Sequence, residues 1–379
     1  MNYRKLGRTG FKISEIGMGT EHLLDKEEQV VIQTIKAAID GGVTYLDCHP
    51  GHDLNHDSHT YEGYAKLGKA LSLAGGRDKL QLTYLASASL PPSEIKPRYE
   101  NFLQDMGTSY IDVFILACCD KVGDYEGITG ENSLLTYAQK LKAEGKIKSI
   151  GISTHSAAVA YKAIDSDVFD VLMYPVNPAF DVVTDEERYK TDDLGTLWDA
   201  AYDFNSEGKS GAQPRKSVYH ECERKGIGLV AMKVFAGGFI FRVEESAGFT
   251  PINLTSYALA QNGISTVVPG CTKPEEIKEI LTYYSCPPED RDYSGAVAKS
   301  RWSVMENCLY CNHCLPCNAN INIAEINRLL DSSDDVRERY KSMKVQASAC
   351  IECGTCLKRC PFQVRVIERM RKAVEVFEN

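Results

Sequence analysis

The stretch that decides the fold is a βαβ pattern within residues 111–155. It begins with IDVFILAC (111–118), continues through a stretch of helical spacing at 131–144, and ends with SIGISTH (149–155). Both apolar runs are continuous rather than alternating, which is typical of parallel strands covered on both faces. The unit therefore predicts an α/β fold built on a parallel sheet.

The same alternation of strands and helices extends over most of the chain. Further strands are expected at 14–20, 44–48, 80–86, 170–177, 227–235 and 265–270, and further helices at 26–40, 93–106, 156–165 and 274–284. Eight βα units in roughly 270 residues predict a (β/α)8 barrel. A doubly wound sheet is the alternative, but no G-x-G-x-x-G follows any strand. YRKLGRTGFKIS (3–14) predicts a hairpin that closes the bottom of the barrel.

Composition limits the class of protein. The chain has 379 residues, enough for two domains or one large domain with an appendage. Its formal net charge of −9 makes nucleic acid an unfavourable partner. No apolar run approaches the roughly 20 residues that cross a bilayer, and residues 1–14 lack the apolar core of a signal peptide. A cytoplasmic protein without a membrane partner is therefore expected.

The 14 cysteines are unevenly distributed, and this indicates a domain boundary. Eight of them lie between positions 308 and 360, so a barrel is expected at 1–290 and a second domain at 291–379, with a linker near 286–300. In a cytoplasmic protein, clustered cysteines indicate metal ligation or redox chemistry rather than disulfides. Residues 181–213 interrupt the barrel pattern and are expected to form either a lid over the barrel mouth or a decorative insertion.

The cysteine motifs are the most specific signal in the chain. The second has the spacing C-x2-C-x2-C-x3-C-P of bacterial ferredoxins, in which the remote cysteine binds the other cluster. Two [4Fe-4S] clusters are therefore expected, one on Cys308, Cys311, Cys314 and Cys360, and the other on Cys350, Cys353, Cys356 and Cys317. The first motif departs from the usual spacing at Cys317, and a pair of zinc sites is the alternative. Helical patterns at 321–330 and 334–343 predict a helical ferredoxin domain.

Residues 1–285 resemble the aldo-keto reductase family, and the whole chain resembles the branch of that family fused to a C-terminal two-cluster [4Fe-4S] ferredoxin domain. The resemblance rests on YRKLGRTGFKISEIGMGT (3–20), GGVTYLDC (41–48), MGTSYIDVFIL (106–116), GKIKSIGISTH (145–155), GLVAMKVFAGG (228–238) and VVPGCTKPEEI (267–277). It implies a (β/α)8 barrel that reduces carbonyls with NAD(P)H through an Asp, a Tyr, a Lys and a His.

Most of that tetrad is not found in this chain. Asp47 stands at the position of the family's Asp, but the resemblance places His52, Tyr84 and Ala117 where the Tyr, Lys and His belong. The family's Tyr acts as an acid because its neighbours lower its pKa. Without that Lys, an imidazole is the better proton donor near neutral pH.

Four candidate catalytic residues follow. His52 is expected to replace the acid, with Tyr61 or Tyr64 of the same long loop as alternatives. His155 and Lys233 end two barrel strands and point toward the mouth, where they join Asp47 as expected site residues. The vicinal pair Cys118-Cys119 also ends a strand and is either a redox contact or two small core residues.

The stretch YLDCHPGHDLNHDSHTY (45–61) contains four of the chain's eight histidines. Three interpretations stay open for it. It is a remodelled active-site loop, a metal site formed by His49, His52, His56 and His59, or a solvated loop without chemistry.

The resemblance also implies where a nicotinamide cofactor would bind. Contacts are expected from Ser153, Gly270, Thr272 and Lys273. Other family positions carry different residue types, namely Thr154, Met173, Met232, Glu276 and Ile280. Thr272 and Glu275 predict a capping box, and the helix start that it marks is a candidate anion site. A glutamate beside a 2′-phosphate repels it, so NAD(P)H binding stays undecided.

Three functions are compatible with these residues. The first is an anaerobic iron–sulfur oxidoreductase that relays electrons between a redox protein, such as a ferredoxin or flavoprotein, and a small carbonyl-type or other organic substrate at the barrel mouth. The second is a catalytically silent barrel that serves as an electron-transfer or scaffold partner. The third is an NAD(P)H-dependent aldo-keto reductase with accessory clusters.

Overall fold

The structure is a computed structural model. It describes residues 1–49, 63–75, 77–182, 214–238, 240–241, 248–299, 308, 314–331, 336–360 and 364–378. Several sequence predictions lie outside these residues, namely those for His52, His56, His59, Tyr61, Cys311 and the segment 183–213.

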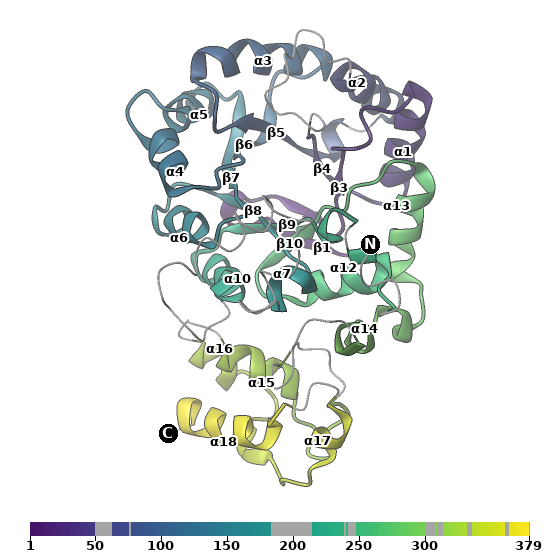
Figure 1. Cartoon of the computed structure of the whole chain (residues 1–379), viewed down its shortest axis with the longest axis vertical. Coiled ribbons are helices and arrows are strands. Elements are labelled where there is room, and N and C mark those ends of the chain that lie inside the picture. The colour runs from purple at the N-terminus through teal and green to yellow at the C-terminus, as the bar shows by residue number, and fades with distance from the viewer. Residues whose placement is uncertain are drawn as a thin grey trace.

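A ring of eight parallel strands forms the centre of the larger part (Figure 1). The strands are β3 (Met18–Gly19), β4 (Tyr45–Asp47), β5 (Gln81–Ser87), β6 (Ile111–Ala117), β7 (Ile147–Ser153), β8 (Val171–Pro175), β9 (Gly228–Met232) and β10 (Ile264–Val267). They pair in chain order, and bridges from Ile16 to Val267 and from Gly19 to Gly270 close the ring. The predicted (β/α)8 barrel is confirmed.

Helices surround the strands on the outside (Figure 1). They are α1 (Glu28–Asp40), α2 (Gly63–Ala74), α3 (Pro92–Asp105), α4 (Val122–Thr129), α5 (Leu134–Ala143), α6 (Ala157–Asp165), α7 (Pro178–Val182), α10 (Pro214–Lys225), α12 (Pro251–Ala260) and α13 (Pro274–Leu281). Short 3-10 helices are η1 (Gly7–Thr9), η2 (Arg77–Lys79), η4 (Ala236–Gly238), η6 (Thr282–Tyr284), η7 (Pro288–Arg291) and η8 (Ala347–Ala349).

Local signals in the sequence explain where several helices begin. The hydroxyl of Ser133 accepts the N–H of Thr136 at the start of α5. Thr250 accepts the N–H of Asn253 at the start of α12, where Pro251 occupies the first turn. Such caps satisfy backbone donors that have no partner inside the helix. They therefore place the starts of these helices independently of tertiary packing.

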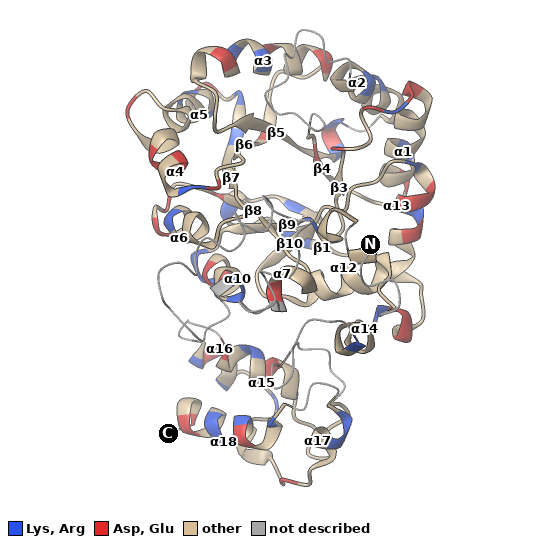
Figure 2. Ribbon diagram, viewed as in Figure 1, with Lys and Arg blue, Asp and Glu red and all other residues tan. Residues whose placement is uncertain are grey.

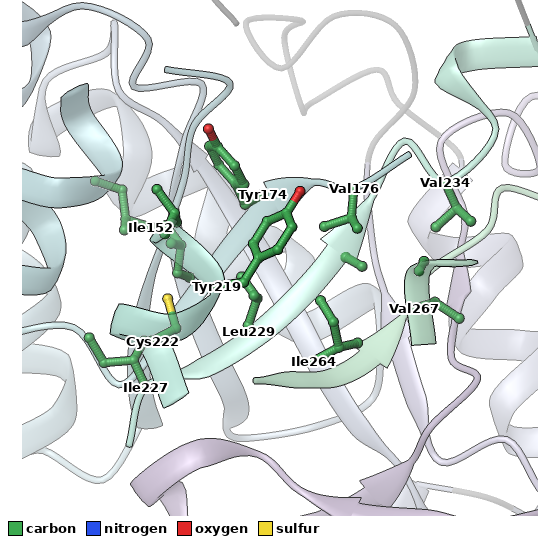
Figure 3. Close-up of a cluster of buried hydrophobic side chains, with 14 of the residues drawn as sticks. Ile152, Tyr174, Val176, Tyr219, Cys222, Ile227, Leu229, Val234, Ile264 and Val267 are labelled. Atoms are coloured by element: carbon green, nitrogen blue, oxygen red, sulfur yellow. The ribbon is translucent and has the colours of Figure 1, made fainter. Parts of the chain in front are cut away.

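Two hydrophobic layers hold the barrel together. Inside the ring, Leu85, Val113 and Val230 pack with Leu6 and Ile13. The last two come from the antiparallel hairpin of β1 (Tyr3–Lys5) and β2 (Lys12–Ser14), which closes the barrel as predicted. Outside the ring, the residues labelled in Figure 3 fill the space between strands and helices, as Tyr219 of α10 does against Tyr174 of β8. Each fully buried large side chain of this kind contributes about 1.5–3 kcal/mol.

The C-terminal part is a small group of helices below the barrel in Figure 1. It consists of α14 (Ser294–Lys299), α15 (Ile323–Leu330), α16 (Arg337–Lys341), α17 (Thr355–Arg359) and α18 (Val366–Phe377). The rings of Tyr340 and Phe377 stack with centroids 4.5 Å apart. Arg328 donates to the carbonyl of Ala260 on α12 at 2.7 Å, so polar bonds attach α15 to the barrel. The helical character predicted for this part is confirmed.

A linker is expected at 286–300, and the structure shows short helices within it. Residues 288–299 form η7 and α14, and Tyr293 between them is buried with its ring 5.3 Å from that of Tyr257 on α12. The proline-rich start of this segment, Cys286–Pro288, suggested a linker, but the apolar residues that follow it anchor it to the barrel.

Charged residues of both signs are interspersed along the outer helices (Figure 2). Among the described residues, no helix is both long enough and apolar enough to span a bilayer.

Candidate functional site

A cavity of about 780 Å³ opens at the carboxyl ends of the barrel strands. Active sites of (β/α)8 barrels lie at this end because the loops that follow the strands converge there. The predicted site residues that line the cavity are Asp47, Ser153, His155, Lys233, Gly270 and Thr272. His49, the described member of the histidine-rich stretch, also lines it. The strand-end positions in the sequence were therefore a good guide to the site.

Asp47 is the last residue of β4 and is 7% exposed. The hydroxyl of Thr83 on the neighbouring strand β5 donates to its Oδ1 atom at 2.9 Å. Burial and, to a lesser extent, the nearby carboxylate of Glu21 outweigh the opposing effects of the Thr83 hydrogen bond and Lys233, and together they raise the pKa of Asp47 to about 7. Asp47 can therefore hold or release a proton near neutral pH.

Lys233 follows β9 and has a left-handed backbone conformation with φ of 51°. Asn177 donates to its carbonyl oxygen at 2.9 Å, which supports this turn. The Nζ atom lies 3.2 Å from Oε2 of Glu21. Burial opposes ionisation of Glu21, but the charge of Lys233 outweighs it with help from His49 and His22, so the pKa of Glu21 lies below its usual value. Lys233 is therefore paired with a carboxylate of the cavity itself.

His155 and Asp120 form a pair at the edge of the cavity. Asp120 follows β6, His155 follows β7, and the His155 Nδ1 atom lies 3.1 Å from Oδ2 of Asp120. The backbone N–H of His155 donates to Oδ1 at 2.7 Å. Burial alone would raise the pKa of Asp120, but the bonds from His155 hold it below its usual value. Asp120 therefore faces the imidazole as a carboxylate.

Ser153 and Cys118 complete this side of the cavity. The Ser153 hydroxyl accepts the N–H of Cys118 at 3.1 Å, so its own proton stays available to a ligand. Desolvation within the cavity and the carboxylate of Asp120 together raise the pKa of Cys118 to about 11. Cys118 lines the cavity as a neutral thiol, whereas Cys119 is fully buried. Cys119 is therefore a small core residue, and a redox role for Cys118 stays a prediction.

Two tyrosines considered from the sequence do not line the cavity. Tyr84 points outward, with its ring 4.9 Å from those of Tyr99 and Phe102, and Leu85 faces the cavity instead. The hydroxyl of Tyr64 donates to the carbonyl of Cys48 at 3.3 Å, and its ring packs against Phe102. Ala117, at the family's His position, faces the barrel interior and has no proton to offer.

The start of α13 differs from the predicted capping box. Glu276, rather than Glu275, accepts the N–H of Thr272 at 2.7 Å and its hydroxyl at 3.1 Å. Lys273 is the N-cap residue without a side-chain cap bond, and its Nζ atom lies 4.0 Å from Glu276. The residue expected to bind an anion, Thr272, is therefore already bonded to a carboxylate.

Cys350 and Cys356 of the second motif lie near Cys317. Burial raises the pKa of Cys356, and the neighbouring Cys350 and Cys317 raise it further. All described cysteines are free thiols. Among the described residues, however, no three His, Cys, Asp or Glu side chains stand at metal-binding geometry.

Two asparagines donate to cysteine sulfurs of the motifs. Asn318 donates through Nδ2 to the sulfur of Cys353, and Asn327 donates through Nδ2 to that of Cys308, both at 3.3 Å. Arg369 orients Asn327 by donating to its Oδ1 atom at 2.8 Å. N–H···S bonds of this kind are typical of iron–sulfur sites.

Sequence reasoning gave no role to two residues of the site. Glu21 and Asp120 both follow barrel strands at the carboxyl end, and this position was the signal available for finding them. Their importance comes from partners that are distant in sequence, Lys233 for Glu21 and His155 for Asp120.

Comparison with known proteins supports the barrel assignment. Residues 15–188 match the model of the Aldo/keto reductase family. The aldo-keto reductase YhdN of Bacillus subtilis (strain 168) is 28% identical over 170 residues, which are 41% of this chain and 48% of the relative. The chain thus spans about half the length of this curated relative.

Solved structures show the same fold. The holo form of the aldo-keto reductase AKR11C1 from Bacillus halodurans superimposes with a TM-score of 0.56 at 17% identity, covering 79% of this chain and 96% of that one. A thermostable aldo-keto reductase, Tm1743, in complex with the inhibitor epalrestat gives a TM-score of 0.54 at 18% identity, covering 78% of this chain and 100% of that one. At this identity the likeness concerns the fold alone.

Proposed function

We propose that this chain, whose residues 15–188 belong to the aldo/keto reductase family, is an iron–sulfur oxidoreductase. Its substrate would be a small carbonyl compound or the corresponding alcohol, bound in the cavity at the barrel mouth. The observation that carries the proposal is the buried carboxyl of Asp47, which lines this cavity with a pKa raised to about 7. A group of that kind can exchange a proton with a reacting substrate at neutral pH.

The eight motif cysteines support a redox role for residues 291–379. We assign Cys308, Cys311, Cys314 and Cys360 to one [4Fe-4S] cluster and Cys350, Cys353, Cys356 and Cys317 to the other. The nearness of Cys317 to Cys350 and Cys356 agrees with the exchange of the fourth ligand between motifs. When bound, the clusters would supply or accept single electrons.

A nicotinamide nucleotide does not fit the residues at the start of α13. Glu276 already accepts a hydrogen bond from the N–H of Thr272, and Glu279 lines the same end of the cavity. A phosphate placed there would face the carboxylates of Glu276 and Glu279 at short range, which is unfavourable, and the nearby cation, Lys273, lies 4.0 Å from Glu276. We therefore derive no hydride step, and we infer that electrons arrive from a redox protein such as a ferredoxin or a flavoprotein.

A nicotinamide-dependent reductase is the second candidate. The match of residues 15–188 to the family model favours it. It requires the catalytic tetrad to be rebuilt. Tyr84, at the position of the family's Lys, packs in the outer core, and Ala117, at the position of the family's His, carries no ionisable group.

The test begins with the protein purified without oxygen. Two cubane clusters require about eight irons and eight sulfides per chain, and fewer than about six irons would overturn the cluster assignment. The Cys353→Ser variant is expected to lose iron. Cys286→Ser is the matched control, because Cys286 lies outside both motifs.

The electron source and the activity are tested on the same preparation. NADPH and NADH are added separately while the cluster absorbance is recorded, and bleaching by either would favour the nicotinamide-dependent candidate. The clusters are then reduced with titanium(III) citrate, and neutral aldehydes and ketones are added. Return of absorbance with formation of alcohol is expected. If no compound in the panel reoxidises the clusters, the proposed oxidoreductase activity is refuted.

A further inference from the structure

We propose that Asp120 is a positioning residue that fixes the tautomer of His155, so that the His155 Nε2 atom exchanges a proton with the oxygen of a neutral alcohol or carbonyl substrate. This inference rests on the proposed oxidoreductase function and names its substrate class. It assigns the exchange with oxygen to a residue that follows β7, whereas the resemblance to known reductases placed the acid in the loop after β4.

The pairing of β6 with β7 brings the two residues together. Leu116 lies opposite Ile152 in the parallel register, so the segments that follow the two strands emerge side by side. Asp120 then accepts three hydrogen bonds from the segment that follows β7. Its Oδ1 atom accepts the backbone N–H of His155 at 2.7 Å and the hydroxyl of Thr154 at 3.4 Å, and its Oδ2 atom lies 3.1 Å from Nδ1 of the ring.

The other ring nitrogen, Nε2, has no partner among the residues that the structure describes. His155 is 8% exposed and lines the cavity. Leaving a buried polar atom unpaired is unfavourable, and such an atom in a native site calls for a functional explanation. A ligand oxygen in the cavity would supply the missing partner.

The contacts of Asp120 determine what Nε2 can do. A carboxylate can only accept, so the neutral ring carries its proton on Nδ1 and presents a lone pair at Nε2. A hydroxyl can donate to that lone pair, and the protonated ring can donate to a carbonyl oxygen. The Ser153 hydroxyl lines the same cavity and has a proton available for a second hydrogen bond to the ligand.

The charges of the cavity favour an uncharged substrate. Glu21, Glu276 and Glu279 line it, and the ammonium group of Lys233 is already paired with Glu21 at 3.2 Å. An anionic substrate would therefore meet carboxylates, whereas Leu85 and the other apolar lining residues suit a neutral molecule.

The reaction balances without a hydride donor. Oxidation of an alcohol to its carbonyl compound breaks one O–H and one C–H bond, forms the C=O double bond, and releases two protons and two electrons. The hydroxyl proton passes to Nε2 of His155, and the proton from carbon passes to the carboxylate of Asp47. The two electrons pass one at a time to a one-electron acceptor, a ferredoxin or flavoprotein. The reverse reaction consumes the same protons and electrons, and titanium(III) can supply the electrons.

The first test measures the tautomer and does not depend on activity. The holoprotein is labelled with ¹⁵N-histidine, and the ring signals of His155 are assigned with the His155→Gln variant. The wild-type ring is expected to be protonated at Nδ1. In Asp120→Asn the amide oxygen must stay on the backbone N–H of His155, so the amide nitrogen faces Nδ1 and the ring proton moves to Nε2. An unchanged tautomer would overturn the proposal.

The second test measures turnover of the carbonyl panel. General acid–base catalysis contributes roughly 10²–10⁴-fold, so Asp120→Asn is expected to lower turnover at least about 100-fold with unchanged iron content. Asp124→Asn is the matched control, since Asp124 is an exposed carboxylate on the same segment. If Asp120→Asn turns over substrate as fast as the wild type, the proposed role of Asp120 is refuted. If the wild type itself shows no turnover, the proposed function is refuted, and the role of Asp120 is then judged from the tautomer measurement alone.

Discussion

Replacing Asp47 with asparagine tests the most perturbed carboxyl of the site. The amide that Asp47→Asn introduces resembles the protonated carboxyl in shape, and its oxygen could still accept the bond that Thr83 donates at 2.9 Å. The substitution therefore removes the cost of burying a negative charge and leaves the packing unchanged. The expected result is a variant that is more stable than the wild type at alkaline pH.

The magnitude follows from the pKa shift. The pKa of Asp47 rises from 3.8 to about 7, a difference of about 3.2, which corresponds to roughly 4 kcal/mol. Because the folded protein holds the proton more tightly, this contribution to stability is complete below pH 3.8 and is lost as the pH rises through about 7. The wild type and Asp47→Asn should therefore be equally stable near pH 4 and differ by about 4 kcal/mol above pH 8.

The assay is urea denaturation of both proteins between pH 4 and pH 9 under anaerobic conditions. The difference in unfolding free energy between the wild type and Asp47→Asn is the quantity to compare, because the contributions of all other titrating groups cancel in that difference. Asp78→Asn, at an exposed carboxylate, is the control and should give a difference that does not change with pH. A flat or inverted difference for Asp47→Asn would refute the reasoning that burial dominates at this position.

Two further substitutions test the charges of the cavity. Lys233→Met leaves the Glu21 carboxylate without its partner at 3.2 Å and should cost about 1–3 kcal/mol in unfolding free energy at pH 8. In the variant Lys233 no longer opposes the effect of burial, so the pKa of Glu21 rises and the cost should be smaller at pH 5. An equal cost at both pH values would contradict this account. Glu276→Arg should free the N–H of Thr272 and tighten NADPH binding at least 10-fold by calorimetry, whereas Glu275→Arg, which makes the same charge change at an exposed neighbour, should not. Equal effects of the two arginines would show that net charge alone governs binding.

Much of the fold could be predicted from the sequence because its signals are local. The continuous apolar run of β6 identifies a strand covered on both faces, and the hairpin of residues 3–14 follows from its turn residues. The side-chain direction of Tyr84 could not be predicted in the same way. A shift of one residue moves a side chain to the other face of a strand, and the choice depends on the neighbouring strands.

The capping at α13 illustrates a smaller error of the same kind. Thr272 followed three residues later by Glu275 matches the sequence pattern of a capping box. In the structure the helix begins one residue later than this pattern requires, and Glu276 makes the bond. Helix ends are often uncertain by one residue, but here that residue decides whether the helix start can receive an anion.

The sequence by itself determined the barrel, its closing hairpin, the helical C-terminal part and the placement of Asp47 and His155 at strand ends. The strands and helices follow from the hydrophobic periodicity of the sequence, and the site positions follow from their place next to a predicted strand. Both signals come from residues that are close together in the chain. Only the tertiary structure decided that Glu21 pairs with Lys233 and that Asp120 fixes the ring of His155. These contacts join residues that are far apart in the chain. The charge of each group also depends on its burial in the folded protein, so neither the contacts nor the charges can be predicted from local sequence.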